Sequence, residues 1–267
     1  MAPPSPFRSS VTGRVNLIAH RGASAHAPEN TLTAFRLAET AGADMVELDV
    51  HLTRDDAVVV IHDETLDRTT DGRGPVRDRT LAEIRALRMR GTDERVPTLD
   101  EVAAWASASR VGLEVEIKQP TAALGRARYP DIAERVSDIL SSRGLVARSI
   151  VHSFDHPTVR RVRDVLPAAT TAVLTGGGVF VDPVGIARAA DASGIHPRWS
   201  SVTEELCEQA HAASLHVHAW GLPEPLDPAV VARLLALGVD SLSANDPAAL
   251  RALLAISAPV ETPTTQS

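Results

Sequence analysis

The sequence predicts a (β/α)8 barrel, the TIM-barrel fold. Short apolar strands alternate with amphipathic helices over about 240 of the 267 residues, an order typical of parallel α/β folds. Two strands carry carboxylates at alternate positions, Glu47 with Asp49 and Glu114 with Glu116. Alternate residues of a strand share one face and helices cover the outside of a parallel sheet, so we expect these acids to point inward. Such barrels carry their active sites at the carboxyl ends of the strands. An open doubly wound sheet is the alternative fold.

Length and composition indicate one globular domain over residues 14–256, with flexible tails at 1–13 and 257–267. A hydrophobic content of 44% and a charged content of 23% are ordinary for such a domain. No apolar run approaches the roughly 18 residues of a membrane span, and the start lacks the apolar core of a signal peptide. Cys207 is the only cysteine, which excludes an intramolecular disulfide and favours a cytoplasmic location.

The charge balance argues against a nucleic-acid partner. The formal net charge is −7, the basic residues are scattered, and aromatic residues make up only 3% of the chain. Binding to nucleic acid favours a basic surface and aromatic side chains for base stacking. We therefore expect a small-molecule ligand, and the sequence leaves a monomer and a homodimer both open.

The first elements predict a βαβ unit. Residues 15–19 form a short apolar strand that ends at His20. Asn30 or Thr31 can cap the helix that follows, and the second strand covers residues 43–50. A right-handed crossover makes two such strands parallel, so both end at the same rim.

The third strand candidate, residues 58–61, leads directly into His62. The link from the second strand is too short for a crossover helix. Either the two strands form a hairpin, or the chain returns to the barrel floor without a helix. We favour the direct return, because it leaves His62 at the same rim as His20 and Asp49.

The fourth strand follows a small insertion, residues 64–99, between the third and fourth strands. This strand, residues 113–118, places Glu114, Glu116 and Lys118 on one face. Lys118 is the only lysine among 27 basic residues, which we interpret as a sign of function. Buried charges must be paired or bind a metal. A simple ion pair between Glu116 and Lys118 is therefore the alternative to a functional site.

The rest of the chain alternates regularly between strands and helices. Nine strand candidates compete for eight barrel positions, so one is extra or wrongly assigned. The expected later strands are 149–153, 170–174, 194–196, 215–220 and 239–243, and the expected later helices are 98–107, 131–142, 157–166, 183–193, 203–214, 228–237 and 247–254.

The polar side chains at the predicted rim suit metal-assisted cleavage of a phosphodiester. Three carboxylates without a thiol indicate a hard divalent cation such as Ca²⁺ or Mg²⁺. Basic side chains beside that cation would bind an anion, most commonly phosphate. Two histidines at the same place suit acid–base catalysis near neutral pH. The converging residues are His20, Arg21, Glu47, Asp49, His62, Glu116 and Lys118, with Trp220 as a further candidate; the inward-facing His216 and His218 are interpreted as structural.

At these residues the sequence resembles the glycerophosphodiester phosphodiesterase family. The resemblance covers about residues 15–250 in the family's order. It is carried by His20-Arg21-Gly22, Pro28-Glu29-Asn30-Thr31, Val46-Glu47-Leu48-Asp49-Val50, Val60-Ile61-His62-Asp63, Arg68-Thr69-Thr70, Val96-Pro97-Thr98-Leu99, Glu116-Ile117-Lys118 and Ser153-Phe154-Asp155-His156.

The resemblance implies a TIM barrel with an insertion before the fourth strand, and hydrolysis of glycerophosphodiesters to glycerol 3-phosphate and an alcohol. It also implies one divalent cation, Ca²⁺ or Mg²⁺, with Mn²⁺ as an alternative. The implied roles are cation binding by Glu47, Asp49 and Glu116, acid–base catalysis by His20 and His62, phosphate binding by Arg21 and Lys118, and lining of the glycerol or headgroup pocket by Phe154 and Trp220.

The sequence departs from the family's pattern in three places. His152 stands beside the implied headgroup pocket, where the family usually has a small residue. Glu114 adds a fourth acid to the site strand, and residues 243–247 replace the usual Thr-Asp-x-Pro at the last strand end. The first two put substrate preference in doubt. Two other functions remain open: a phospholipase D-like lyase that leaves a cyclic phosphate, and a non-catalytic barrel that binds phosphorylated ligands.

Overall fold

Eight parallel strands close into a barrel in the computed structural model, which describes residues 6–120 and 127–257. Each strand pairs with its neighbour in chain order, and pairing of β1 with both β2 and β9 closes the ring. This confirms the barrel and excludes the open sheet. The barrel strands are β1 (Asn16–Ala19), β2 (Met45–Leu52), β4 (Gly112–Ile117), β5 (Ser149–Ser153), β6 (Thr170–Thr175), β7 (Gly194–Pro197), β8 (His216–Ala219) and β9 (Ser241–Ala244).

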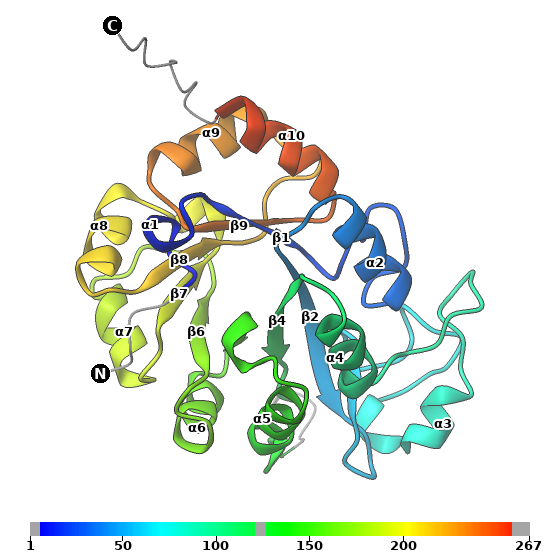
Figure 1. The fold of residues 1–267 in the computed structure, drawn as a ribbon. Helices are drawn as coiled ribbons and strands as arrows, with labels where there is room; N and C mark the ends of the chain where they lie inside the picture. Colours follow the sequence, from blue (N-terminus) through cyan, green and yellow to red (C-terminus); the bar gives the residue numbers. More distant parts are fainter. Residues whose placement is uncertain (1–5, 121–126, 258–267) are drawn as a thin grey trace, which may run out of the picture.

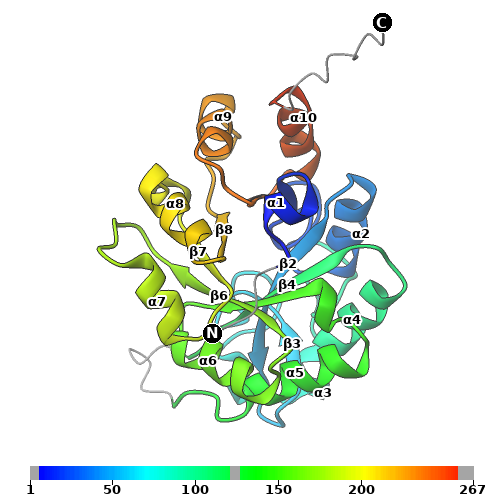
Figure 2. The same cartoon turned by 60° about the vertical axis from the view of Figure 1, so that its left-hand side comes forward.

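Helices surround the strands, as Figures 1 and 2 show. Side-chain caps fix where most of them begin: Thr31 and Thr98 accept hydrogen bonds from the first turns of α2 and α4, and Asp155 caps α6 just before a proline. The helices are α2 (Leu32–Thr40), α4 (Leu99–Ser107), α5 (Ile132–Ser142), α6 (His156–Val165), α7 (Pro183–Ala189), α8 (Glu204–Ala212), α9 (Pro228–Ala236) and α10 (Pro247–Ser257). Within the described ranges, no helix is both long enough and apolar enough to cross a membrane.

The strand β3 (Val58–Val60) lies outside the barrel. It pairs antiparallel with the end of β2, with Val60 opposite Val50. The two strands therefore form a hairpin, and our expectation of a direct parallel return is wrong. β3 is the ninth strand candidate, and the hairpin carries the chain back to the rim of the barrel at His62.

The segment between β3 and α4 packs on a small core of its own. It contains the short 3₁₀ helix η1 (Val76–Asp78) and α3 (Leu81–Arg85), which lies to the side of the barrel in Figure 1. Seven buried side chains form this core, separately from the main one: Val59, Ile61, Leu66, Val76, Ile84, Met89 and Val96. The segment corresponds to the expected insertion at 64–99.

The expected tails lie partly outside the described residues, which exclude 1–5 and 258–267. Within the first expected tail, α1 (Ser9–Thr12) contacts the barrel. The backbone N–H and the hydroxyl of Ser9 both donate to the carboxylate of Asp240, at 2.7 and 2.8 Å. Asn16 in β1 also donates to the carbonyl of Phe7 at 3.0 Å. Residues 7–12 are therefore held against the barrel.

The barrel interior is layered from apolar to polar. At the amino-terminal ends of the strands, Ile18, Met45, Ile150 and Ala172 form a buried apolar cluster with Phe7 against it. Further along the strands the inward side chains are polar and charged. This polarity cannot stabilise the fold by the hydrophobic effect, so it indicates where the function lies.

Candidate active site

The parallel register brings the predicted carboxylates together at the carboxyl-terminal rim. Asp49 in β2 lies directly beside Glu116 in β4, and Glu47 lies beside Glu114 one layer deeper. All four are buried, and Asp49 is fully so. Neighbouring residues in register point to the same face, so the strand pairing forces these acids into one small volume.

Asp49 is the acid whose negative charge is balanced by neighbouring positive side chains. Its two carboxylate oxygens lie 3.0 Å from Nζ of Lys118 and 3.3 Å from Nε of Arg21. The side-chain amide of Asn30 donates a further hydrogen bond at 2.9 Å. Burial alone would raise the pKa of Asp49, but Lys118 and Arg21 outweigh burial and hold the pKa well below its usual range. Asp49 is therefore ionised at neutral pH.

Glu47 and Glu116 lack such compensation. Burial raises the pKa of Glu47 well above its ordinary value, and repulsion by Asp49 and Glu116 raises it further. Burial likewise raises the pKa of Glu116 to about 7, although Lys118 lies 2.5 Å from its carboxylate. Two buried carboxylates that resist ionisation are a good environment for a cation, because a cation would supply the missing positive charge. Their hard oxygen donors suit Ca²⁺, Mg²⁺ or Mn²⁺.

The two predicted acid–base histidines are held in place through Nδ1. His20 Nδ1 lies 2.7 Å from the side-chain oxygen of Asn245, and His62 Nδ1 lies 2.7 Å from a carboxylate oxygen of Asp63. About a third of each histidine side chain is exposed. Burial, and then Arg21, lower the pKa of His20 to about 4. His20 is therefore neutral at pH 7, with Nε2 free of its proton.

The hairpin places His62 beside the carboxylates. The backbone N–H of Ile61 donates to the carbonyl of Asp49 at 2.9 Å, which extends the β2–β3 pairing up to the rim. His62 thus reaches the same end of the barrel as Asp49. The structure places His62 where we expected it, but the chain returns there through a hairpin and not by the direct return that we expected.

A cavity of about 320 Å³ opens beside the carboxylates. Glu116, Lys118 and Phe154 line it, together with the ends of β4 and β5. The ring of Phe154 is 48% exposed and meets the ring of Trp220 edge to face, with centroids 5.5 Å apart. Trp220 itself is anchored by its indole N–H, which donates to the carbonyl of His196 at 3.0 Å. The ring of Phe154 thus gives the cavity an apolar side next to Glu116 and Lys118, and Trp220 supports that ring from outside the cavity lining.

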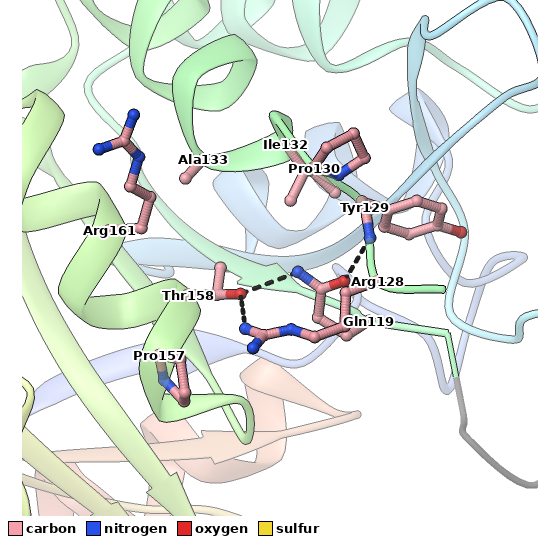
Figure 3. A pocket seen from close by; sticks show the side chains of 9 residues that line it. All are labelled: Gln119, Arg128, Tyr129, Pro130, Ile132, Ala133, Pro157, Thr158 and Arg161. Carbon is pink, nitrogen blue, oxygen red and sulfur yellow. Dashed lines mark hydrogen bonds between the residues drawn. The ribbon is translucent and has the colours of Figure 1, made fainter. Parts of the chain in front are cut away.

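A second hollow, of about 260 Å³, lies between α5 and α6 (Figure 3). Gln119 borders both cavities. Its amide donates to the hydroxyl of Thr158 at 2.8 Å, and its side-chain carbonyl accepts the backbone N–H of Tyr129 at 2.8 Å. Among the described residues that line this hollow there is none of the predicted site residues. The chemistry is therefore concentrated in the cavity at the rim.

Glu114 and His152 lie inside the barrel at different levels. Glu114 is level with Glu47, one layer below the rim, whereas His152 is level with Glu116. Both side chains are buried, and Glu114 is fully so. Glu114 Oε1 is 3.6 Å from Nδ1 of His196 and Oε2 is 3.9 Å from Nε2 of His218. These two departures from the family pattern therefore belong to one lumen cluster and not to the headgroup wall. The inward position of His216 and His218 agrees with the sequence-based prediction.

Sequence reasoning missed the residues that orient the predicted ones. Asn30 was considered only as a helix cap, yet it adopts a left-handed backbone with φ of 59° and holds Asp49. Glu29 pairs with Arg21 at 3.1 Å and Arg68 with Glu29 at 2.7 Å. The motifs that carried the resemblance contain all three, Glu29, Asn30 and Arg68, and this was the available signal.

The chain matches known proteins over most of its length. A family model described as "Glycerophosphoryl diester phosphodiesterase family" matches residues 20–249. A glycerophosphodiester phosphodiesterase of Caldanaerobacter subterraneus subsp. tengcongensis is 36% identical over 240 residues, which cover 88% of this chain and 95% of the relative.

Solved structures show the same fold. A crystal structure of a glycerophosphodiester phosphodiesterase from Agrobacterium tumefaciens superimposes with a TM-score of 0.74 at 28% identity, covering 89% of this chain and 99% of the other. An Oleispira antarctica phosphodiesterase, solved in complex with the product sn-glycerol-3-phosphate, superimposes with a TM-score of 0.79 at 26% identity, covering 91% and 98%.

Proposed function

The chain belongs to the glycerophosphoryl diester phosphodiesterase family, and from this premise we propose that it hydrolyses glycerophosphodiesters to glycerol 3-phosphate and an alcohol with the help of a bound divalent cation. One observation carries the proposal. Two histidines stand at the rim where Asp49, Lys118 and Arg21 meet two buried glutamates, Glu47 and Glu116, whose pKa values burial raises. The product complex of the Oleispira relative supports the same reaction here.

Glu47, Asp49 and Glu116 would hold the cation. Glu47 and Glu116 retain unneutralised acceptor capacity, and Asp49 is already ionised. When bound, the cation supplies Lewis-acid polarisation of the phosphoryl oxygens. The finer identity of the ion, Ca²⁺, Mg²⁺ or Mn²⁺, is part of the proposal.

Arg21 and Lys118 would bind the phosphate. Both side chains are mostly buried and both contact Asp49, so their positions are fixed before a substrate arrives. The planar guanidinium of Arg21 suits two phosphoryl oxygens at once, whereas Lys118 acts as a compact point charge. Such preorganised cations favour the additional negative charge that develops in the transition state.

The two histidines divide the proton transfers according to their partners. His20 is neutral and donates Nδ1–H to an amide oxygen, so its free Nε2 would accept the proton of the neighbouring glycerol hydroxyl as that hydroxyl attacks phosphorus. Burial, with Lys118 and Arg21, lowers the pKa of His62 despite the opposing effects of Asp49 and Asp63. The contact of Nδ1 with the Asp63 carboxylate would stabilise the ring when it carries a second proton during turnover, so we assign the protonation of the departing alcohol to His62. Water then opens the cyclic phosphate with the two roles reversed.

Phe154 and Trp220 would line the glycerol or headgroup pocket. Their edge-to-face rings present an apolar surface next to the phosphate site. We further propose that residues 14–256 are the catalytic unit, that the chain acts as a monomer or homodimer, and that it works in the cytoplasm, as its single cysteine favours.

Phosphorus NMR of a reaction with glycerophosphocholine tests the proposed function. We expect the diester signal to be replaced by that of glycerol 3-phosphate, with cyclic phosphate present at most as an intermediate. Accumulation of cyclic phosphate as the end product would establish the lyase reaction instead. No turnover of glycerophosphocholine, glycerophosphoethanolamine or glycerophosphoglycerol with Ca²⁺, Mg²⁺ or Mn²⁺ supplied would refute the proposed function.

A further inference from the structure

Four buried histidines line the barrel lumen below the rim: His152 in β5, His196 in β7, and His216 and His218 in β8. We call them the lumen histidines. Three of them form a chain of hydrogen bonds. His152 Nδ1 lies 2.9 Å from His196 Nδ1, and His196 Nε2 lies 2.8 Å from His216 Nε2. At the far end, His216 Nδ1 lies 3.1 Å from the carbonyl oxygen of Ser193.

This series of hydrogen bonds, which we call the tautomer chain, fixes which nitrogen of each ring carries the hydrogen. A carbonyl only accepts, so Nδ1 of His216 carries its hydrogen and Nε2 is an acceptor in the neutral ring. Burial lowers the pKa of His216 to about 4, so the ring is neutral at pH 7. His196 must then donate from Nε2 and accept at Nδ1. His152 must donate from Nδ1, which leaves a lone pair on its Nε2.

That lone pair has no partner in the described part of the chain. Nε2 of His152 is buried and makes no hydrogen bond there. His152 stands beside Glu116 in the register of β4 and β5, so both side chains point into the lumen at the same level. One nitrogen of His152, one oxygen of Glu47 and one oxygen of Glu116 all lie within 4.8 Å of one another. Because Nδ1 carries the hydrogen that His152 donates to His196, Nε2 holds the lone pair that a metal could take.

We propose that Nε2 of His152 is a ligand of the same cation that Glu47 and Glu116 bind. The inference rests on the proposed function, because it extends the cation site invoked there. His196 is then a positioning residue, since it fixes which nitrogen of His152 carries the lone pair. His152 therefore has a role distinct from the lining of a headgroup pocket.

A nitrogen ligand changes which metals the site prefers. Ca²⁺ and Mg²⁺ bind almost only to oxygen, whereas imidazole suits Mn²⁺ less strongly than Co²⁺ or Zn²⁺ but is accepted by all three. A donor set of three carboxylates, from Glu47, Asp49 and Glu116, and one imidazole thus suits transition metals better than three carboxylates alone would. The preference distinguishes this chain from a site made of carboxylates alone.

A competing arrangement uses the same histidine. Glu114, His152 and His196 also bring one ligand atom each within 4.8 Å of one another, and both oxygens of Glu114 lack a hydrogen-bond partner in the described residues. Nδ1 of His196 is the nitrogen that lies near Glu114, 3.6 Å from Oε1. That nitrogen already accepts the hydrogen bond from Nδ1 of His152 at 2.9 Å, an ordinary hydrogen-bond distance, so it is not free for a metal. We therefore favour the site at Glu47 and Glu116.

Pulsed electron paramagnetic resonance of the metal-free full chain reloaded with Mn²⁺ tests the ligand directly. We expect nitrogen hyperfine modulation from a coordinated imidazole in the wild type. The modulation should disappear in His152→Ala and persist in His218→Ala, a matched variant that removes an equally buried histidine of the same lumen outside the tautomer chain. Bound Mn²⁺ without nitrogen modulation in the wild type would overturn the inference, whatever the variants do.

The location of the metal is tested by two further variants. Glu116→Gln should weaken Mn²⁺ binding, whereas Glu114→Gln should leave both the binding and the nitrogen modulation in place. If Glu114→Gln abolished the modulation and Glu116→Gln did not, the metal would lie deeper in the lumen and the proposed ligand set would be wrong.

Metal affinities measured by calorimetry distinguish a ligand from a structural residue, because loss of a nitrogen ligand affects Co²⁺ and Ca²⁺ differently. His152→Ala should weaken Co²⁺ binding by at least about 10-fold and Ca²⁺ binding by less than about 3-fold. His196→Ala should weaken Co²⁺ binding roughly 10-fold through loss of the fixed tautomer. Equal losses for both metals would contradict a nitrogen ligand.

Failure of the inference and failure of the proposed function are distinguishable. If the wild type hydrolyses glycerophosphocholine but its Mn²⁺ has no nitrogen ligand, only the inference fails. If nitrogen ligation is found without any hydrolysis, only the proposed function fails.

Discussion

The rim and the lumen of this barrel bury ionisable groups in opposite ways. At the rim, Asp49 is surrounded by Lys118 and Arg21 and remains charged. In the lumen the described residues place no lysine or arginine beside Glu114, and burial, with repulsion from Glu116, raises the pKa of Glu114 to about 8. The lumen histidines are likewise kept neutral by burial. Burial is similar in both regions. Asp49 contacts two cations and stays charged, whereas Glu116, which contacts Lys118 alone, has a pKa raised to about 7.

The comparison assigns different tasks to the two regions. Charged groups held by fixed counter-ions can bind an anionic substrate and a metal, and exposed histidines beside them can exchange protons with solvent. Neutral rings in a closed lumen can only orient one another through hydrogen bonds. The rim therefore suits chemistry and the lumen suits positioning, and His152 is the residue where the two regions meet.

The largest expected effect belongs to the rim histidine His62. We expect His62→Ala to lower turnover of glycerophosphocholine by about 1,000-fold, within the range typical for loss of a general acid or base. The side chain is about a third exposed, so the unfolding midpoint should change little. Steady-state kinetics together with thermal unfolding measure both quantities. Near-normal turnover in this variant would remove His62 from the mechanism.

Loss of the rim cation Lys118 should cost stability as well as activity. Lys118→Met leaves Asp49 and Glu116 buried with one positive partner fewer, and removing one member of a buried ion pair typically costs about 3 kcal/mol. Urea unfolding of the metal-free protein at pH 7 measures this cost. Glu114→Gln is the matched change in the lumen, and we expect its unfolding free energy not to decrease. Equal destabilisation by the two substitutions would contradict the contrast between the regions.

The lumen histidines should make the free energy of unfolding depend on pH in the acid range. Burial lowers the pKa values of His196, His216 and His218, so at low pH their unfolded forms take up protons that the folded forms refuse. The histidine share of the stability is therefore lost as pH falls below the ordinary histidine pKa of 6.5, down to about 4 for His216. Burial raises the pKa of Glu114 to about 8 and that of Glu116 to about 7, and these two groups act in the opposite direction over the same range, so the histidine share is measured as the difference between the wild type and a histidine variant. For each histidine that stays neutral in the folded protein, the free energy of unfolding falls by up to about 1.4 kcal/mol per pH unit over this range.

Urea unfolding at pH 7, 6 and 5 measures how the free energy of unfolding changes with pH. His218→Gln should remove part of the loss of stability that the histidines cause on acidification. Carboxylates held ionised at the rim, such as Asp49, lose their stabilising effect only below about pH 4, which separates the two regions. A slope unchanged by His218→Gln would show that this histidine is protonated in the folded protein.

The smallest expected effect lies at the edge of the rim cavity. Phe154 is 48% exposed and touches Trp220 edge to face. Phe154→Ala should raise KM for glycerophosphocholine a few-fold, change kcat little, and reduce stability by less than about 1 kcal/mol, since an exposed aromatic pair contributes modestly. A large loss of kcat instead would mean that Phe154 positions the reacting phosphate.

The sequence was sufficient to predict the barrel and to predict which residues lie at its rim in most cases. Alternation of strands and helices predicted the parallel strands, and the period of two along β2 and β4 predicted which acids point inward. These are local patterns that hydrophobic burial enforces. Lys118, unusual in composition, proved to contact Asp49 as a buried site residue would.

What could not be predicted depends on the geometry of one turn and on a contact between strands distant in sequence. The direction of β3 is decided by a tight turn in which the N–H of Thr53 donates to the carbonyl of Ala57, and where Asp56 adopts a positive φ of 61°. The importance of His152 depends on its register with Glu116 and on a hydrogen bond to His196, 44 residues away. Neither relation leaves a trace in local periodicity.

Release of glycerol 3-phosphate from glycerophosphocholine by chelator-treated protein, before and after a divalent cation is added back, tests the central claim most directly. We predict no turnover by the metal-free wild type, recovery when the cation is restored, and no recovery for Glu116→Gln at the same metal concentration. Full activity in the metal-free wild type, or equal recovery by Glu116→Gln, would contradict the account of the rim as a cation-dependent phosphodiesterase site.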